Sequence, residues 1–387
     1  MKINLINPPQ EELYDPSAYP HLGLLYLGAV LKRAGHKPHY IDLSATGEHK
    51  VPKADYHLIT VTTPMYTSAM KVIGGIDDGG KIVVGGIHPT ICPDDFTSVD
   101  YVVRGEAEKS IVDIVEGRVA ERIVNCEIVR DLDTLPFPAR EIMPIEHLRH
   151  LGGVHGDAYR GDGASTTIIS SRGCPFHCTF CCKIQQTEFV RYRSALNVKE
   201  EVVECQEKYD IHHFRFVDDI FTLNKKRVYE LCDALKPLDV YWLTITRADV
   251  VDQRMLDKMY GAGCREVALG IESGSQRMLN LMGKRETTQQ YLKSIEMIKK
   301  AGLKVKCFFM YNFPGETEKD LELTKKFILK AKPDKWTLSR FSPLPGSYIW
   351  NHPKEFNLKI NKNYDEYWFY PEDGNMLKEF LKSNEWR

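Results

Sequence analysis

The sequence predicts an α/β protein made of an N-terminal doubly wound, Rossmann-like domain, a partial, TIM-like (β/α)6 barrel and a short C-terminal extension. The sequence contains two series in which short apolar stretches alternate with stretches of helical periodicity. The first runs from residue 1 to about 118, and the second begins at residue 165. The intervening residues 121–164 contain several Pro and Gly and little periodicity, which is typical of a linker. A chain of 387 residues is also too long for a single hydrophobic core.

The first series, residues 1–120, indicates a parallel sheet with helices on both faces. The expected strands are Ile3–Ile6, His39–Leu43, Tyr56–Thr62, Lys81–Val84 and Tyr101–Arg104, and the expected helices are Leu22–Ala34, Met65–Ile76 and Glu108–Glu116. Such sheets bind ligands at the carboxyl ends of their strands. The segment between Leu43 and Tyr56 is too short and too polar for the usual crossover helix, so we expect a shortened domain.

The second series, residues 165–345, contains six βα units. Its expected strands are Thr166–Ser170, His213–Val217, Tyr241–Ile245, Glu266–Leu269, Val305–Met310 and Trp336–Phe341, with helices Val198–Tyr209, Lys225–Leu235, Gln253–Ala262, Thr288–Ala301 and Glu318–Ala331 between them. Six units predict an incomplete parallel barrel with its chemistry at the carboxyl ends of the strands. The aromatic-rich residues 346–387 are expected to cover the barrel mouth.

The composition excludes several classes of protein. With 43% apolar residues, 27% charged residues and a net charge of −1, the chain has no broad attraction for nucleic acid or anionic membranes. No apolar run approaches the roughly 18 to 20 residues of a membrane span, and the first residues lack the pattern of a signal peptide. The ten Cys do not form the dense framework of a small secreted domain. We therefore expect a protein of the reducing cytoplasm.

A loop directly after the first strand of the second series contains the pattern CxxxCxxC. Its cysteines are Cys174, Cys178 and Cys181, within the segment Arg172–Cys182. Three thiolates in such a loop can hold an iron–sulfur cube and leave its fourth iron without a protein ligand. An open iron can chelate the amino and carboxylate groups of a sulfonium substrate, and transfer of one electron then cleaves the C–S bond.

The loop also admits interpretations other than a cluster. A structural zinc site normally has four ligands, and no second CxxC pair follows, so zinc is disfavoured. His177 is better explained as a spacer than as a fourth ligand. For Cys182 three roles remain open: an alternative ligand, a participant in the radical chemistry, or a small buried residue.

With this motif placed in a βα series, the chain resembles the radical S-adenosylmethionine (SAM) superfamily over most of its length. The resemblance implies a [4Fe–4S] cluster held by the three cysteines, SAM bound against the cluster, and a reducing partner such as flavodoxin or ferredoxin. It also implies residues that contact SAM, which are Phe180, Asp218, Asp219, Arg247, Glu272 and Ser273.

The resemblance gives several of these residues a role. The segment that contains Asp218 and Asp219 resembles the position that receives the amino group of SAM, and Arg247 resembles the residue that pairs with its carboxylate. Glu272 would accept hydrogen bonds from the ribose hydroxyls of SAM. Each of these acids could instead be a helix cap or a surface charge.

The fifth barrel strand ends in Met310–Thr317, which is similar to the Gly-x-Pro-Gly-Glu-Thr segment of the superfamily. Asn312 stands where the family has glycine, so its side chain is expected to project toward the reaction chamber. Tyr311 and Asn312 are therefore candidate substrate contacts, and Thr317 is also a candidate helix cap.

The first domain resembles the cobalamin (B12)-binding domain that precedes the barrel in one branch of the superfamily. The resemblance rests on the segments Asn7–Pro9, His21–Leu27, Val84–Thr90 and Asp100–Glu106, and on Arg140 in the linker. It implies a cobalamin site formed by Pro8, Pro9, Gly23, Thr62, Thr63, Gly85, Gly86, His88 and Glu106. The Asp-x-His-x-x-Gly signature is absent, so the lower ligand of cobalt is undefined. For His21 and His88, the nearest imidazoles, a structural hydrogen-bonding role is favoured.

Together the two resemblances imply a class B-like radical SAM methylase. Such an enzyme methylates an unactivated carbon of a small-molecule, lipid or peptide substrate through a 5′-deoxyadenosyl radical and methylcobalamin. The first alternative is a cobalamin-independent radical dehydratase, epimerase or cyclase with a vestigial N-terminal domain. The second is a non-catalytic iron–sulfur sensor. Nucleic acid is disfavoured as a substrate because no RNA-binding appendage is recognised.

Overall fold

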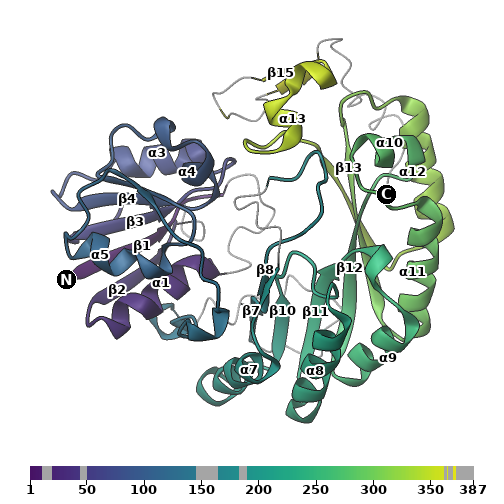
Figure 1. The fold of residues 1–387 in the computed structure, drawn as a ribbon, viewed down its shortest axis with the longest axis horizontal. Coiled ribbons are helices and arrows are strands. Elements are labelled where there is room, and N and C mark those ends of the chain that lie inside the picture. Colours follow the sequence, from purple (N-terminus) through teal and green to yellow (C-terminus); the bar gives the residue numbers. More distant parts are fainter. Residues whose placement is uncertain are drawn as a thin grey trace.

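A computed structural model of the chain describes residues 1–10, 20–43, 50–144, 164–182, 190–360, 364 and 369–371. Two six-stranded parallel sheets lie side by side, each accompanied by helices, and α13 and β15 lie between them at the top of the view in Figure 1. The predicted α/β class with two successive sheets is therefore confirmed. Among the described residues, no helix is long and apolar enough to cross a membrane.

The N-terminal sheet has the strand order β2-β1-β3-β4-β5-β6. Its strands are β1 (Lys2–Asn7), β2 (Lys37–Asp42), β3 (Tyr56–Thr60), β4 (Lys81–Gly85), β5 (Tyr101–Arg104) and β6 (Ile123–Asn125). The order reverses between β1 and β3, which creates the switch point where doubly wound sheets bind ligands. Strand β6 lies in the stretch expected to be linker, because three residues are too few to give a recognisable strand pattern.

Helices cover both faces of this sheet, as the sequence predicts. The helices are α1 (Leu22–Arg33), α3 (Tyr66–Gly74), α4 (Ile87–Ile91) and α5 (Ile111–Val115), with short 3-10 turns at Pro93–Asp95, Ala107–Lys109, Leu132–Thr134 and Arg140–Ile142. Apolar residues of α1 and α5 pack on one face and those of α3 on the other. The crossover between β2 and β3 includes residues 44–49, so the expected lack of a helix there falls largely outside the described residues.

The second sheet has the order β14-β13-β12-β11-β10-β7, with all neighbours parallel. Its strands are β7 (Ser165–Ile168), β10 (His213–Phe216), β11 (Tyr241–Thr246), β12 (Cys264–Glu272), β13 (Lys304–Tyr311) and β14 (Lys335–Arg340). Its helices are α7 (Ala195–Tyr209), α8 (Lys225–Leu235), α9 (Gln253–Gly261), α10 (Gln276–Leu281), α11 (Thr288–Lys300) and α12 (Glu318–Ala331). The helices lie outside a curved, open sheet (Figure 1), which confirms the predicted partial barrel.

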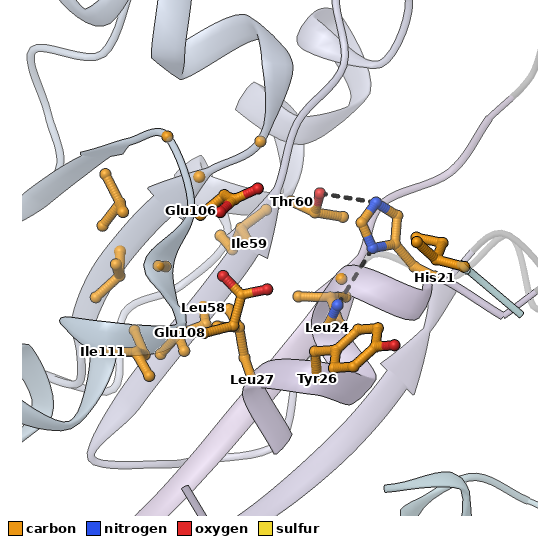
Figure 2. A pocket seen from close by; sticks show the side chains of 18 of the residues that line it. His21, Leu24, Tyr26, Leu27, Leu58, Ile59, Thr60, Glu106, Glu108 and Ile111 are labelled. Carbon is orange, nitrogen blue, oxygen red and sulfur yellow. Dashed lines mark hydrogen bonds between the residues drawn. The ribbon is translucent and has the colours of Figure 1, made fainter. Parts of the chain in front are cut away.

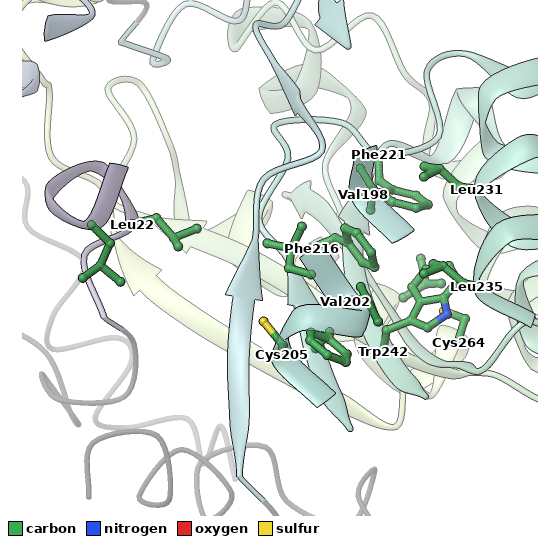
Figure 3. Close-up of a cluster of buried hydrophobic side chains, with 14 of the residues drawn as sticks. Leu22, Val198, Val202, Cys205, Phe216, Phe221, Leu231, Leu235, Trp242 and Cys264 are labelled. Carbon is green, nitrogen blue, oxygen red and sulfur yellow. The ribbon is translucent and has the colours of Figure 1, made fainter. Parts of the chain in front are cut away.

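The hydrophobic core runs without interruption from one sheet to the other. In the barrel, the rings of Phe216, Phe221 and Trp242 contact one another beneath apolar residues of α7 and α8 (Figure 3). Leu22 of α1 and Met143 of the linker belong to the same cluster of buried side chains. The two domains are therefore packed against each other.

A buried group of charges fixes the linker to the barrel. Arg140 donates to Glu201 Oε1 on α7 at 2.6 Å, and Arg193 donates to the second oxygen of the same carboxylate. These three side chains are at most 3% exposed. Burial alone would raise the pKa of Glu201, but the two guanidinium groups outweigh burial and lower it. Glu201 is therefore ionised and paired.

The C-terminal extension contributes α13 (Tyr348–Asn351), a 3-10 turn at Pro353–Phe356, and the antiparallel strands β15 (Leu358–Ile360) and β16 (Phe369–Pro371). Ile349 and Leu358 pack with Phe313 and Phe341, which follow barrel strands β13 and β14. This part of the extension therefore lies at the carboxyl ends of the strands; that the whole segment covers the barrel mouth stays a prediction. Residues 372–387 are outside the described part of the chain.

We predict that Arg140→Ala lowers the free energy of unfolding by about 3–5 kcal/mol, because it leaves the buried carboxylate of Glu201 with one partner fewer. Urea titration followed by circular dichroism measures this loss. Lys32→Ala is the control: it breaks an exposed ion pair with Glu141 and should cost less than about 1 kcal/mol. Equal losses in the two variants would contradict this account of the linker.

Candidate active site

The cysteine loop leaves a short antiparallel ribbon formed by β8 (Ser171–Arg172) and β9 (Arg191–Tyr192). Cys174, Cys178 and Cys181 lie close enough together to interact electrostatically. Burial, followed by the charges of Cys178 and Cys174, raises the pKa of Cys181 to about 12. Three cysteine side chains held this close together are a donor set that suits an iron–sulfur cluster, whose irons bind them as thiolates.

Two aspartates after β10 hold the segment that enters this loop. Asp218 is 1% exposed and accepts hydrogen bonds from Ser170 N (2.7 Å), Ser170 Oγ (2.6 Å) and Ser171 Oγ (2.5 Å). Asp219 accepts from Gly173 N at 3.1 Å. Both residues therefore lie beside the loop, where Asp218 acts as an anchor; contact of either with SAM stays a prediction.

Arg247, at the end of β11, contacts the loop from another side. Its guanidinium lies 3.7 Å from the ring centroid of Phe176, which lies between the first two cysteines. The same guanidinium donates to both oxygens of Asp249 (3.0 and 2.9 Å) and lies 3.1 Å from Glu286 Oε2. Arg247 thus combines a cation–π contact with two ion pairs. Its pairing with the SAM carboxylate stays a prediction.

A second group of charges surrounds Glu272, at the end of β12. Burial raises the pKa of Glu272. The charge of Lys284 acts to lower this pKa, and the charge of Glu286 raises it further. Lys284 Nζ lies 3.7 Å from Glu272 Oε1 and 3.5 Å from Glu286 Oε2, and it donates to Gly270 O at 2.7 Å. This arrangement places one cation between two acids at the strand ends, beside the cysteines.

Lys284 and Glu286 are site residues that sequence reasoning missed. They lie between α10 and α11, in a Gly-Lys-Arg-Glu segment that looks like an ordinary solvated turn. Both are nevertheless buried, at 5% and 1% exposure. A buried charge of this kind is recognisable only once the fold brings its partners to it.

The remaining candidate contacts of the barrel also lie around its mouth. Ser273 is buried and accepts from Ser275 N at 3.1 Å, so it shapes the turn after β12. Phe180 packs against the apolar cluster that contains Ile349 of the extension. Thr317 and Asp320 form a capping box at the start of α12, which confirms the predicted cap.

Tyr311 is the last residue of β13, and Asn312 follows it at this mouth. Asn312 has a positive φ of 65°, a conformation that glycine adopts most readily and that Asn tolerates better than most residues. Its backbone N–H donates to Glu316 Oε2 at 2.6 Å, and burial raises the pKa of Glu316 to about 8. The backbone geometry thus agrees with the glycine that the superfamily has here. Substrate contact stays a prediction.

The N-terminal domain contains a largely apolar cavity of about 220 Å³ between α1 and the strands β3, β4 and β5 (Figure 2). Its lining includes Gly23, Gly85, Gly86 and Glu106 from the predicted cobalamin site. It also includes Leu58, Val83, Val103 and Ile111 as apolar walls. Ile169 and Arg172, which precede the cysteine loop, also line the cavity. Such a lining fits an apolar group such as the benzimidazole tail of cobalamin.

The polar side chains of this cavity differ in part from those expected. Thr60 lines it, whereas Thr62 and Thr63 are not among the lining residues. Thr60 Oγ1 is hydrogen-bonded to His21 Nε2 at 3.1 Å, and His21 Nδ1 accepts from Leu24 N as the cap of α1 (Figure 2). Burial lowers the pKa of His21, which favours the neutral ring. His21 therefore has the structural role that was expected.

His88, Pro8 and Pro9 lie outside the cavity lining. His88 is fully buried, with Nδ1 3.1 Å from Thr63 Oγ1 and Nε2 3.2 Å from Asp95 Oδ2. The carbonyl of Pro9 accepts a hydrogen bond from Ser68 Oγ at 2.7 Å. These contacts give His88 the structural role favoured from the sequence. Direct contact of any of the three with cobalamin stays a prediction.

A largely apolar cavity lies beside an open barrel that presents three cysteines, which agrees with the cofactors that the sequence predicts. Residues 168–328 match the family described as the Radical SAM superfamily, and residues 16–115 match the B12 binding domain. The chain is 31% identical to an uncharacterized methyltransferase of Pyrococcus horikoshii, over 95% of this chain and 86% of that protein. The chain therefore belongs to the radical SAM superfamily, in the branch with a B12-binding domain. Its cofactors are a [4Fe–4S] cluster, SAM and cobalamin.

Other similar proteins differ in the reaction that they carry out. The chain is 26% identical to an anaerobic magnesium-protoporphyrin IX monomethyl ester cyclase of Cereibacter sphaeroides, over 85% of this chain and 59% of that protein. In fold it is similar to the radical SAM methyltransferase TsrM from Kitasatospora setae, whose structure contains cobalamin and a [4Fe–4S] cluster. The TM-score is 0.71 at 15% identity, with 93% of this chain and 77% of TsrM covered.

We predict that Gly86→Ala weakens cobalamin binding at least about tenfold, or about 1.4 kcal/mol. Gly86 has a φ of 106°, and a Cβ atom there would lie 2.9 Å from Val61 O, so the turn that lines the cavity must move. Equilibrium dialysis with hydroxocobalamin measures the affinity.

Gly35→Ala is the matched control for this substitution. Gly35 also has a positive φ, of 83°, but a Cβ there meets no atom within 4 Å, and the residue lies outside the cavity lining. The control should keep wild-type affinity, and an equal loss in both variants would argue against this cavity as the cobalamin site.

Proposed function

We propose that this chain is a cobalamin-dependent radical SAM methylase that adds a methyl group to an unactivated carbon of a small-molecule, lipid or peptide substrate. The observation that carries the proposal is the cavity of the N-terminal domain, whose lining includes Ile169 and Arg172, just before the cysteine loop. When bound, the cluster supplies the electron that cleaves SAM, and the corrinoid carries the methyl group. A cavity in this position supports the use of both cofactors on one substrate.

The side chains of the barrel would bind and orient SAM. We assign the cluster to Cys174, Cys178 and Cys181. Phe176, packed against Arg247, would keep the loop in register with the barrel. The carboxylate of Glu272 would accept hydrogen bonds from the ribose hydroxyls of SAM. The ammonium group of the neighbouring Lys284 would offset the charge of this carboxylate. The reducing partner, of the flavodoxin or ferredoxin kind, would deliver its electron from outside.

The barrel mouth would exclude water and foreign hydrogen donors. Phe313, Phe341 and Ile349 form a buried apolar cluster there, and Ile349 N donates to Thr179 O of the cysteine loop at 3.0 Å. The extension is thereby joined both to the strand ends and to the loop. Tyr311 and Asn312 would contact the substrate in the space that remains.

The proposal predicts that reconstituted, reduced protein transfers the label of methyl-labelled SAM to its bound cobalamin and also forms 5′-deoxyadenosine. Both products are measured by anaerobic chromatography, with the Cys174→Ala/Cys178→Ala/Cys181→Ala variant as the control without a cluster. Deoxyadenosine without any retained corrinoid after gel filtration would overturn the methylase assignment. Retained corrinoid with no SAM cleavage would instead favour a cluster-containing sensor.

Neighbouring cysteines should behave differently when replaced. Cys181→Ala is expected to lose most cluster iron and sulfide, because the cube then lacks one of its three protein ligands. Cys182→Ala should keep the wild-type content, since the adjacent residue lies outside the CxxxCxxC pattern. Iron and sulfide analysis after anaerobic reconstitution measures both. Loss of the cluster in Cys182→Ala would make Cys182 a ligand.

A radical cyclase is the second candidate, favoured by the similarity to the magnesium-protoporphyrin ester cyclase. Mass spectrometry of the product separates the two reactions. A methylase product gains the labelled methyl group, whereas a cyclase product loses hydrogen and carries no label.

A further inference from the structure

One carboxylate of the N-terminal domain receives several donors from the segment around the cysteine loop. Glu106, just after β5, accepts two hydrogen bonds from Arg191 at 2.7 and 2.8 Å and lies 3.2 Å from Arg172 Nη1. It also accepts from Val129 N at 2.6 Å. Burial acts to raise the pKa of Glu106, but Arg191 and Arg172 outweigh it and the pKa is lowered. The ionised carboxylate is thus engaged by protein groups, although Glu106 lines the cavity.

Arg172 contacts further lining residues of the same cavity. Its Nη2 donates to Glu108 Oε1 at 2.7 Å, and its guanidinium lies 5.3 Å from the ring centroid of Tyr26 on α1. The side chain is 16% exposed, so the pairs are largely shielded from water. Arg172, Glu106, Glu108 and Tyr26 together form one wall of the cavity.

The two arginines belong to the ribbon from which the cysteine loop extends. Arg172 on β8 pairs in register with Arg191 on β9. Cys174 follows Arg172 after a single residue, Gly173, so the two strands are the two ends of the segment that contains the cysteines. Both ends of that segment are therefore held by the same acid of the other domain.

We propose that Arg172 is a positioning residue that couples occupancy of the cobalamin cavity to the geometry of the cluster loop. The inference rests on the proposed placement of cobalamin in this cavity. The benzimidazole tail of bound cobalamin packs against the wall that contains Arg172 and restricts the Arg172 side chain. This restriction fixes the start of the cysteine loop. A bound cluster fixes the ribbon and thereby preforms the wall. Because such coupling is reciprocal, each cofactor strengthens binding of the other by the same factor.

The test compares cobalamin affinity in protein with its cluster and in protein stripped of it by a chelator. By equilibrium dialysis, the full-length wild type should bind hydroxocobalamin about tenfold more tightly with the cluster present. In Arg172→Gln the ratio should fall to about one. Glu108→Gln, which removes charge from the other domain, should lower it as well. Arg172→Lys keeps the charge without the fork that spans two acids and should retain part of the ratio.

A spectroscopic measurement separates coupling from a general loss of stability. Addition of cobalamin should change the electron paramagnetic resonance spectrum of the reduced cluster in the wild type and leave it unchanged in Arg172→Gln. Arg118→Gln is the control, since Arg118 pairs with Asp113 and Glu116 on an exposed part of the N-terminal domain. It should keep both the ratio and the spectral change.

The outcomes distinguish this inference from the proposed function. Wild-type protein that binds cobalamin equally with and without the cluster would overturn the coupling and leave the methylase proposal standing. The coupling would also be overturned if both Arg172→Gln and Glu108→Gln kept the wild-type ratio of cobalamin affinities with and without the cluster. Wild-type protein that binds no cobalamin in either state would overturn both.

Discussion

The need to hold three cysteines of an irregular loop close together is the constraint on which the site depends. A loop without regular structure cannot hold such groups together by its own hydrogen bonds, so neighbouring elements must hold it. Asp218 fixes its beginning and Arg247 its middle through Phe176, while Thr179 N donates to Met282 O at 2.9 Å after α10. Each anchor comes from a different βα unit, and the barrel thereby positions a segment that has little structure of its own.

Buried charged groups join the linker and the N-terminal domain to the second half of the chain. Glu201 lies between Arg140 and Arg193, and Glu106 lies between Arg172 and Arg191. Removing a carboxylate from water is costly, so a buried pair contributes less to stability than its short distances suggest. Two guanidinium groups around one acid satisfy most of its lone pairs in a fixed geometry. The arrangement thus favours one orientation of the domains over others.

The sequence predicts the alternation of strands and helices well, because strands buried on both faces form continuous apolar runs such as Leu58–Ile59 and Val83–Val84. The cysteine motif is equally visible because its chemistry is local. Strand ends are less certain: a strand expected to reach Thr62 ends at Thr60, which moves the lining hydroxyl by two residues. Lys284 and Arg172 acquire their roles from partners in distant segments, and no local pattern marks such pairs.

The unbroken apolar core described above also limits how this protein can be taken apart. Leu22, Met143 and Ile168 share one buried cluster although they come from the first domain, the linker and the barrel. Expressing either half alone would expose that surface to solvent and favour aggregation. If one half were exchanged for that of a distant relative, the apolar surfaces of the two halves would not be complementary. Chimeras intended to alter the substrate should therefore exchange only segments at the barrel mouth and keep the boundary between the domains intact.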